Sequence, residues 1–267
     1  MSERNEYSAG VPCWVDTLAP DVDAALRFYG GVFGWEFSGP GPVGDGLGYH
    51  VAQVRGGDVA GVGAQPDPSI PIGWNTYVAV ANVEAASARA AGAGAEILTG
   101  PTEAAPAGSF AVVADPTGAS LCLWEPGVRQ GAQRVNEPSA WAMSALQTPD
   151  PERATAFYSE LFGWQPEPFD AGSVQVTLMR LPGYVGGEPE QPVPRDVVAV
   201  VIPAADNLTP AGWSVDFWID DADAAAGRAA ELGGQVLVAP HDVPGFRRSV
   251  LADPAGSAFS VSRLVGH

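Results

Sequence analysis

Apolar and polar residues alternate along residues 12–18, a period of two that predicts a short β-strand with one buried face. In the next segment apolar side chains recur every four residues, which predicts an amphipathic helix that starts at Asp21 and ends at Gly34. Apolar stretches around 47–55 and 58–64 predict further strands separated by a glycine turn. The chain therefore begins with a strand, a helix and a group of strands.

The same order of elements then appears a second time. It is predicted as a strand at 75–81, a helix at 83–91 closed by Gly92, a Gly/Pro turn at 105–108, and hairpin strands at 109–114 and 119–124 joined by Asp115-Pro116-Thr117-Gly118. Each pass fits a βαβββ module, and the abundance of glycine and proline fits a fold that is rich in turns.

The chain also repeats itself on a larger scale. Asp21 of the first predicted helix recurs as Asp150, 129 positions later, within a matching segment. Three blocks recur in one order: 19–37 as 148–166, the block opened by Gly73-Trp74 as that opened by Gly212-Trp213, and 114–126 as 252–264. Such ordered self-similarity indicates a duplication, so we predict four βαβββ modules in two halves.

The pattern predicts an N-terminal arm, two domains and a linker. Their bounds are 1–10 for a flexible arm, 11–126 for the first domain, 127–137 for a short polar linker and 138–264 for the second domain. The irregular segment 183–195 is predicted as a surface loop. Because two fused halves can pair with each other about a pseudo-twofold axis, we expect a monomer.

Composition narrows the classes of partner. The 267 residues carry a net charge of −18, and all 13 basic residues are arginines. Such a surface repels phosphate backbones and anionic lipid, which argues against nucleic-acid and membrane partners. No secretory signal or membrane span is visible. Cys13 and Cys122 are predicted to be reduced, and we expect a cytoplasmic protein.

The two halves resemble the glyoxalase/bleomycin-resistance/extradiol-dioxygenase (vicinal oxygen chelate) superfamily. The resemblance rests on the helix pattern D-x-x-x-A-x-x-F-Y-x-x-x-F-G-W, which begins at Asp21 and at Asp150, and on the D-P-x-G hairpins that begin at Asp115 and Asp253. It implies an α+β fold in which the four modules form two cupped mixed sheets. Relatives include isomerases, ring-cleaving dioxygenases, epimerases and antibiotic-binding proteins. More narrowly, the chain resembles two-domain actinobacterial members that are often found beside natural-product pathways.

The resemblance also gives positions for metal ligands, and this chain departs from the family there. The positions that would carry histidine, glutamine or glutamate hold Trp14, Asn75 and Cys122 in the first half and Met143, Ser214 and Ser260 in the second. The fourth strand of each half, at 58–64 and 197–203, offers no carboxylate that would face the cup. Divalent metals need convergent imidazole and carboxylate groups. We therefore predict no bound metal and no other cofactor.

Strand alternation predicts which side chains share the cup with these positions. They are Trp14, Asp16, Asn75, Tyr77, Ser120, Cys122 and Trp124 in the first half, and Met143, Ala145, Gln147, Ser214, Asp216, Trp218, Ser260 and Ser262 in the second. Aromatic groups with a few polar ones are typical of a small-molecule site. For the aromatic side chains, core packing and ligand stacking remain equally open.

Three titratable residues are candidate catalysts: Asp16, Asp216 and His50. A carboxylate in mid-strand on a concave face is costly to bury unless it is paired or functional, and burial would move its pKa towards that of a general base. The alternative for both aspartates is an arginine ion pair or a solvent-facing position. His50, next to Tyr49, is a candidate acid or base.

Several functions fit these features. The leading hypothesis is a metal-independent protein that binds a small aromatic or polycyclic natural-product-like molecule and, as a cofactor-free lyase or isomerase, moves protons on it. Asp16 or Asp216 would be the base. His50, Tyr77 or Asn75 would orient the substrate or stabilise an oxyanion. The alternatives are a drug-sequestering self-resistance protein, and a metal-dependent lyase or dioxygenase with unrecognised ligands.

Overall fold

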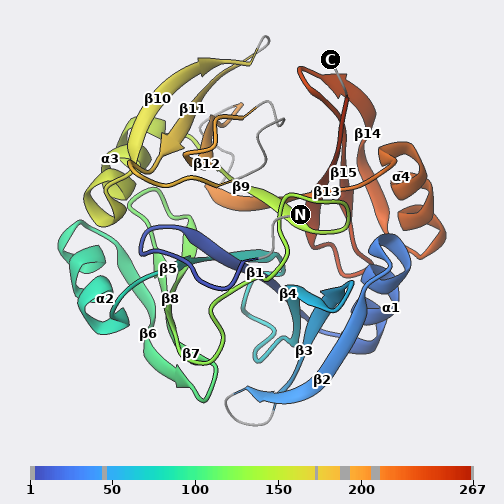
Figure 1. Ribbon diagram of the computed structural model, residues 1–267, viewed down its shortest axis with the longest axis horizontal. Helices are drawn as coiled ribbons and strands as arrows, with labels where there is room; N and C mark the ends of the chain where they lie inside the picture. The colour runs from blue at the N-terminus through green and yellow to red at the C-terminus, as the bar shows by residue number, and fades with distance from the viewer. Residues whose placement is uncertain (1–3, 44–46, 172–173, 187–192, 206–210, 266–267) are drawn as a thin grey trace.

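The computed structural model describes residues 4–43, 47–171, 174–186, 193–205 and 211–265, and it is shown in Figure 1. The first half consists of β1 (Pro12–Ala19), α1 (Val22–Phe33), β2 (Glu36–Val43), β3 (Leu47–Val54), β4 (Gly57–Ala64), β5 (Trp74–Ala79), α2 (Val83–Gly92), β6 (Glu96–Ala104), β7 (Gly108–Ala114) and β8 (Ser120–Pro126). The predicted βαβββ order is therefore present twice in this half.

The second half repeats that order. It consists of β9 (Trp141–Thr148), α3 (Pro151–Phe162), β10 (Gln165–Asp170), β11 (Gln175–Arg180), β12 (Val197–Pro203), β13 (Gly212–Trp218), α4 (Ala222–Glu231), β14 (Gln235–Val243), β15 (Phe246–Ala252) and β16 (Ala258–Leu264). The predicted α+β architecture of two halves, each built from two βαβββ modules, is confirmed. The predicted loop 183–195 lies partly outside the described residues, since 187–192 are not among them.

Each half forms one eight-stranded mixed sheet. The strand orders are β2-β3-β4-β1-β5-β8-β7-β6 and β10-β11-β12-β9-β13-β16-β15-β14. Within each module the first and last strands pair in parallel, as β1 does with β4 and β5 with β8. The two modules of a half join through the antiparallel pair β1–β5 or β9–β13. The first strand of every module thus lies near the middle of its sheet.

The helices begin and end largely where the sequence predicts. The Asp21 side chain accepts a hydrogen bond from the backbone N–H of Ala24 at 2.9 Å, and Gly34 takes a left-handed conformation with φ 69°. The prediction that Gly92 closes α2 was wrong by two residues. Gly92 is the last helical residue, and Gly94, with φ 95°, is the one that turns the chain.

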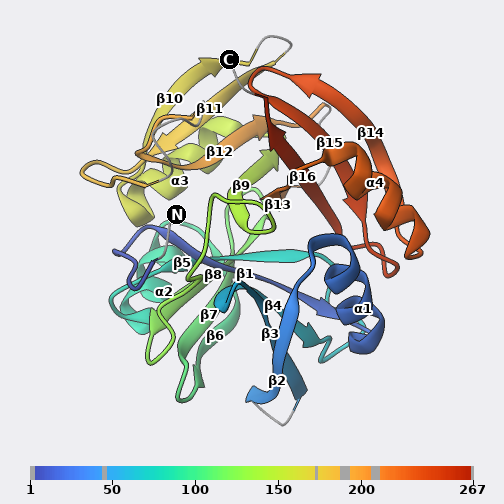
Figure 2. The ribbon, with the colours of Figure 1, turned by 45° about the vertical axis from the view of Figure 1, so that its right-hand side comes forward.

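The two halves pack on each other through their helical faces. One core cluster joins α1 and β1 to β13, β16 and α4, and a second joins α2 and β8 to β9 and α3 (Figure 2). One polar contact occurs twice with the halves exchanged: Tyr29 donates to Asp253 at 3.0 Å, and Tyr158 donates to Asp115 at 2.8 Å. The aspartates of the two D-P-x-G hairpins therefore tie each half to the other.

Neither cysteine forms a disulfide within the described residues. Cys13 and Cys122 are both buried free thiols, and burial raises the pKa of each. Among the described residues no helix is long and apolar enough to cross a lipid bilayer.

Candidate functional site

A single set of polar and aromatic side chains projects from the first sheet on the face opposite the helices. Strand register places Trp14 opposite Tyr77, and Asp16 opposite Asn75, on the pair β1–β5. The next strand, β8, places Cys122 beside Tyr77. The rings of Tyr77 and Trp124 meet edge to face, with centroids 6.3 Å apart. All five residues that sequence alternation assigned to ligand binding in the first half, namely Trp14, Asn75, Tyr77, Cys122 and Trp124, lie on this surface, called the Asp16 face below.

Asp16 lies at the centre of this face and is only 2% exposed. Its Oδ1 accepts a hydrogen bond from Asn75 Nδ2 at 2.8 Å, and its Oδ2 accepts from the hydroxyls of Tyr77 at 2.8 Å and Tyr49 at 2.9 Å. All three donors are neutral, and within the described residues no arginine or histidine pairs with this carboxyl group. Burial raises the pKa of Asp16, and the three hydrogen bonds only partly offset that rise.

Tyr49 belongs to this group, and the sequence analysis did not select it. It comes from β3 and reaches Asp16 across β4, where Gly61 and Gly63 leave the necessary space. A Cβ atom on Gly61 would lie 1.9 Å from the Tyr49 hydroxyl oxygen, and one on Gly63 would lie 2.9 Å from the Tyr49 ring. Glycines at alternate positions of β4, all on one face, are the sequence signal that predicts a large side chain lying over this strand.

The structure does not bring His50 to Asp16. His50 follows Tyr49 directly in β3, and neighbouring residues of a strand point to opposite faces. Since the Tyr49 hydroxyl is bonded to Asp16, the imidazole of His50 projects from the other side of the sheet. His50, predicted as an acid or base, therefore lies on the face of the sheet opposite to Asp16, and its neighbour Tyr49 is the residue that contacts Asp16.

The two tyrosines differ in their remaining hydrogen bonds. Tyr49 also accepts a bond from Trp14 Nε1 at 2.9 Å, so its oxygen is engaged on both sides. The Tyr77 hydroxyl has only the Cys122 thiol, a weak hydrogen-bonding group, as a further neighbour, and no N–H or O–H group of the described residues donates to its oxygen. Burial first, and then the nearby Asp16 charge, raise the pKa of Tyr77 well above 10. Tyr77 is thus the neutral hydroxyl that retains capacity for a ligand.

The second sheet carries different chemistry at the corresponding positions. Asp216 holds the position in the second sheet that Tyr77 holds in the first. It lies opposite Met143 and beside Ser260, whereas Tyr77 lies opposite Trp14 and beside Cys122. Its Oδ1 accepts from Ser262 at 2.7 Å, and Arg248 Nε lies 3.6 Å from the same oxygen. Burial raises the pKa of Asp216, and the Arg248 charge opposes that rise.

The other predicted residues of the second half have separate surroundings. Ser214 donates to the backbone oxygen of Ala145 at 3.2 Å, and Ala145 holds the position that corresponds to Asp16. Trp218 is 8% exposed, and its ring faces Phe246 with centroids 6.5 Å apart. Asp16 and Asp216 therefore belong to two separate sites, one in each sheet.

The donor set does not fit a divalent metal. Among the described residues no three His, Cys, Asp or Glu side chains gather closely enough to hold an ion. The Asp16 oxygens already accept three hydrogen bonds from neutral groups, and a cation there would have to displace donors that the sheet holds in place. The family's ligand positions carry indole, amide and thiol in the first half, and thioether and hydroxyls in the second.

Comparison with known proteins agrees with this architecture. Residues 14–123 match the family described as "Glyoxalase/Bleomycin resistance protein/Dioxygenase superfamily", and residues 141–262 match "Glyoxalase-like domain". CFP32 of Mycobacterium tuberculosis (strain CDC 1551 / Oshkosh) is 36% identical over 98% of this chain and 97% of its own length. The chain belongs to the glyoxalase/bleomycin resistance protein/dioxygenase superfamily.

Two further members of this superfamily are informative. "Anthracycline biosynthesis protein DauV" of Streptomyces sp. (strain C5) is 32% identical over 97% of this chain and 94% of its own length. The Mn(II)-bound glyoxalase from Novosphingobium aromaticivorans superposes with a TM-score of 0.65 at 17% identity, covering 96% of this chain and 82% of that one. The structural likeness shows the fold, and the natural-product relative shows the kind of protein to which this sequence is similar.

Proposed function

We propose that the Asp16 face binds a small aromatic or polycyclic molecule of the natural-product type and transfers a proton on it without a metal. One observation carries this proposal: a buried carboxyl group is held by three neutral donors at the centre of an aromatic surface. A carboxyl group kept only for stability is usually paired with a cation or replaced by an apolar residue. Its retention here without a cation favours a role in chemistry.

Tyr77 and Asp16 together form the proton acceptor in this proposal. The Tyr77 oxygen takes a proton from an acidic C–H group of the ligand, next to a carbonyl, while the Tyr77 hydroxyl passes its own proton to Asp16 Oδ2. The C–H electron pair becomes an enolate, and Asp16 becomes a neutral carboxylic acid. Return of the proton at another carbon completes an isomerisation, whereas loss of a leaving group from the enolate completes an elimination. A raised pKa at Asp16 makes the acceptance of this proton easier.

The remaining polar residues position this pair. Asn75 holds Oδ1 of Asp16 at 2.8 Å, and Tyr49 holds Oδ2 while being fixed itself by Trp14 Nε1. These bonds fix the orientation of the carboxyl group. Tyr77, which is bonded to the same carboxyl group, is the residue whose oxygen can still accept a proton or hydrogen bond from a ligand. Preorganisation of this kind lowers the reorganisation needed during proton transfer.

The ligand class rests on the aromatic side chains and on the relatives. Trp14, Tyr77 and Trp124 are all partly exposed around Asp16, so flat π-faces surround the carboxyl group. Relatives named for anthracycline biosynthesis favour a polycyclic aromatic ligand. The reciprocal contacts between the halves also support the proposal that one chain is the complete working unit.

The test begins with native mass spectrometry and metal analysis of the protein purified from its own producing cells. The expected result is a non-covalent organic adduct without stoichiometric metal. The recovered ligand is then incubated in D₂O with the wild type, Asp16→Asn and Asp23→Asn, a matched exposed control. We expect deuterium in the ligand with the wild type and the control only. A stoichiometric divalent metal would overturn metal independence, and an undeuterated, unchanged ligand would instead indicate a sequestering protein.

A further inference from the structure

The second sheet carries a polar group that has no counterpart in the first. Arg248 lies opposite Ser262 on β15–β16, as Phe110 lies opposite Trp124 on β7–β8. Where the first half has the Phe110 ring, the second half therefore has the Arg248 guanidinium, which lies beside Asp216. We call Asp216, Arg248, Ser260 and Ser262 the Asp216 cluster.

Arg248 and Asp216 are incompletely bonded. Arg248 Nη2 donates to Ser260 Oγ at 2.8 Å, but its buried Nε has no hydrogen-bond partner and lies 3.6 Å from Asp216 Oδ1. That oxygen already accepts from Ser262 at 2.7 Å. Within the described residues Arg248 Nη1 and Asp216 Oδ2 make no hydrogen bond. Both side chains are partly exposed, at 33% for Arg248 and 14% for Asp216, so neither is sealed inside the protein.

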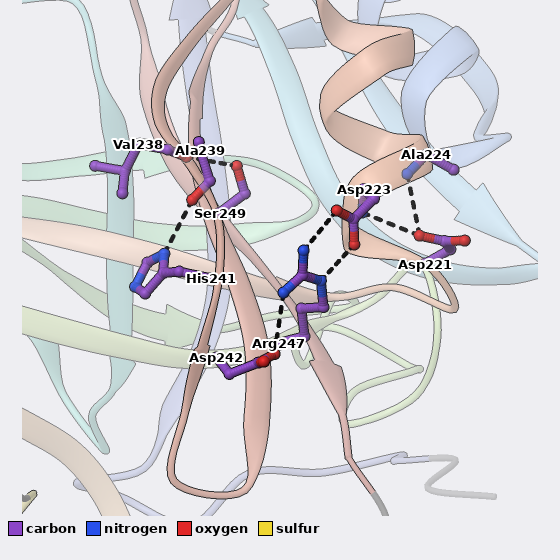
Figure 3. A network of polar contacts seen from close by, with 9 residues as sticks. All are labelled: Asp221, Asp223, Ala224, Val238, Ala239, His241, Asp242, Arg247 and Ser249. Atoms are coloured by element: carbon purple, nitrogen blue, oxygen red, sulfur yellow. Dashed lines mark hydrogen bonds and ion pairs between the residues drawn. The ribbon is translucent and has the colours of Figure 1, made fainter.

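The neighbouring arginine shows that Arg248 is not part of the surface charge network. Arg247 lies between Asp223 of α4 and Asp242 of β14, and Figure 3 shows these ion pairs on the helical side of the sheet. Because neighbouring residues of a strand point to opposite faces, Arg248 projects from the helix-free side. Arg247 is saturated by two carboxylates, whereas Arg248 has one loose pairing.

The cluster suits a neutral ligand group with an acceptor and a donor side by side. Arg248 repels a cation and Asp216 repels an anion, while the pair together carries no net charge. A primary carboxamide satisfies both, because its oxygen accepts from the guanidinium and its NH₂ group donates to the carboxylate. Phe246 and Met143 are partly exposed on the same face and provide apolar contacts for the body of such a ligand, while the buried Trp218 ring packs against Phe246.

We infer that the Asp216 cluster is a second binding site, separate from the Asp16 face, for an apolar molecule that bears a neutral donor–acceptor group such as a carboxamide. The two sites lie in different sheets and share no residue. The proposal of the second site is therefore independent of the proposal of proton transfer at Asp16.

The test measures binding of 1-naphthamide to the full chain by isothermal titration calorimetry and by amide chemical shifts. The charged compounds 1-naphthoate and 1-naphthylmethylamine serve as probes with the same ring. The variants are Arg248→Met, Asp216→Ala and the matched control Arg247→Gln, each checked for folding by circular dichroism. We expect the amide to bind more tightly than either charged probe. The affinity for the amide should fall about tenfold in both cluster variants and stay unchanged in Arg247→Gln.

Other outcomes are equally decisive. Tighter binding of 1-naphthoate that disappears in Arg248→Met would replace the proposal with an anion site. No binding of the amide up to its solubility limit, equal affinity in all variants, or shift changes confined to residues around Asp16 would each overturn it.

Discussion

The phenol of Tyr49 lies directly over the backbone of Gly61, where a Cβ atom would come within 1.9 Å of the hydroxyl oxygen. The same Cβ would lie 3.0 Å from Cβ of Asp16, so Gly61 leaves room for both members of this hydrogen bond. The absence of a side chain at position 61 thus allows a tyrosine from one strand to hold a carboxyl group two strands away. The candidate site depends on this glycine although glycine carries no functional group.

Gly61→Ala should displace Tyr49 from Asp16 while leaving the fold intact. We expect a loss of about 1–3 kcal/mol in the free energy of unfolding, because the added methyl group overpacks the contact. The rate of deuterium exchange into the ligand should fall together with the stability. Urea denaturation and the deuterium assay measure the two effects.

Gly92→Ala is the matched control for this substitution, since nothing lies within 4 Å of a Cβ added at that helical position. It should leave stability unchanged or raise it by up to about 1 kcal/mol. Equal behaviour of the two variants would show that the contact between Tyr49 and Asp16 does not depend on the glycine.

The contribution of Asp16 to stability should fall as the pH rises above 3.8, the ordinary pKa of an aspartate. Burial raises its pKa in the folded protein above the ordinary 3.8, so the folded state favours the protonated carboxyl group. That contribution is fully present below pH 3.8 and disappears as the pH passes the raised value. In Asp16→Asn it is absent, so the difference in melting temperature, wild type minus variant, should decrease with rising pH.

Differential scanning fluorimetry between about pH 4 and 9 measures this difference, and effects common to all other carboxyl groups cancel in it. A wild type that gains stability over Asp16→Asn as pH rises would mean that hydrogen bonding outweighs burial and that the pKa of Asp16 is lowered.

Sequence patterns could predict the fold because it is repeated and periodic, whereas the site depends on contacts across strands. Alternation placed Asp16, Asn75 and Tyr77 on one face, and the register β1–β5 brings them together. Tyr49 comes from a strand that is not adjacent to β1, so no local pattern connects it to Asp16. His50 was proposed for its imidazole, but adjacent residues of a strand point to opposite faces, so only Tyr49 of this pair faces Asp16.

Arg248 was missed for a related reason. In the sequence it is one of two consecutive arginines, and nothing local shows which of them faces the helix and which faces Asp216. The register β15–β16 decides this, since it places Arg248 opposite Ser262. Long-range pairing of this kind is a property of the folded sheet, and a single sequence contains no direct signal for it.

Tyr77→Phe should separate chemistry from stability on the Asp16 face. The substitution removes the hydroxyl that retains capacity for a ligand, so proton exchange should fall at least about a hundredfold. Asp16 keeps two of its three hydrogen bonds, from Tyr49 and Asn75, and the unfolding free energy should change by only about 1–2 kcal/mol. Deuterium incorporation and urea denaturation on the same preparation measure both. Unchanged exchange in Tyr77→Phe would remove this tyrosine from the proton path.

The contact that ties the halves together predicts unequal costs for two equivalent substitutions. Tyr29→Phe leaves Asp253 Oδ2 without its donor, and Tyr158→Phe does the same to Asp115. The Tyr158 oxygen also accepts from Trp213 Nε1 at 3.0 Å, whereas Nε1 of Trp74, the corresponding residue, lies near the Tyr29 oxygen without a hydrogen bond of normal geometry. Tyr158→Phe therefore also leaves the Trp213 Nε1 group without its acceptor. It should lower the free energy of unfolding by about 1–3 kcal/mol more than Tyr29→Phe does. Equilibrium denaturation compares them directly, with Trp213→Phe added to Tyr158→Phe as the control that should recover most of the difference. Equal losses of unfolding free energy in the two single variants would show that the hydrogen bond from Trp213 does not stabilise the contact between the halves.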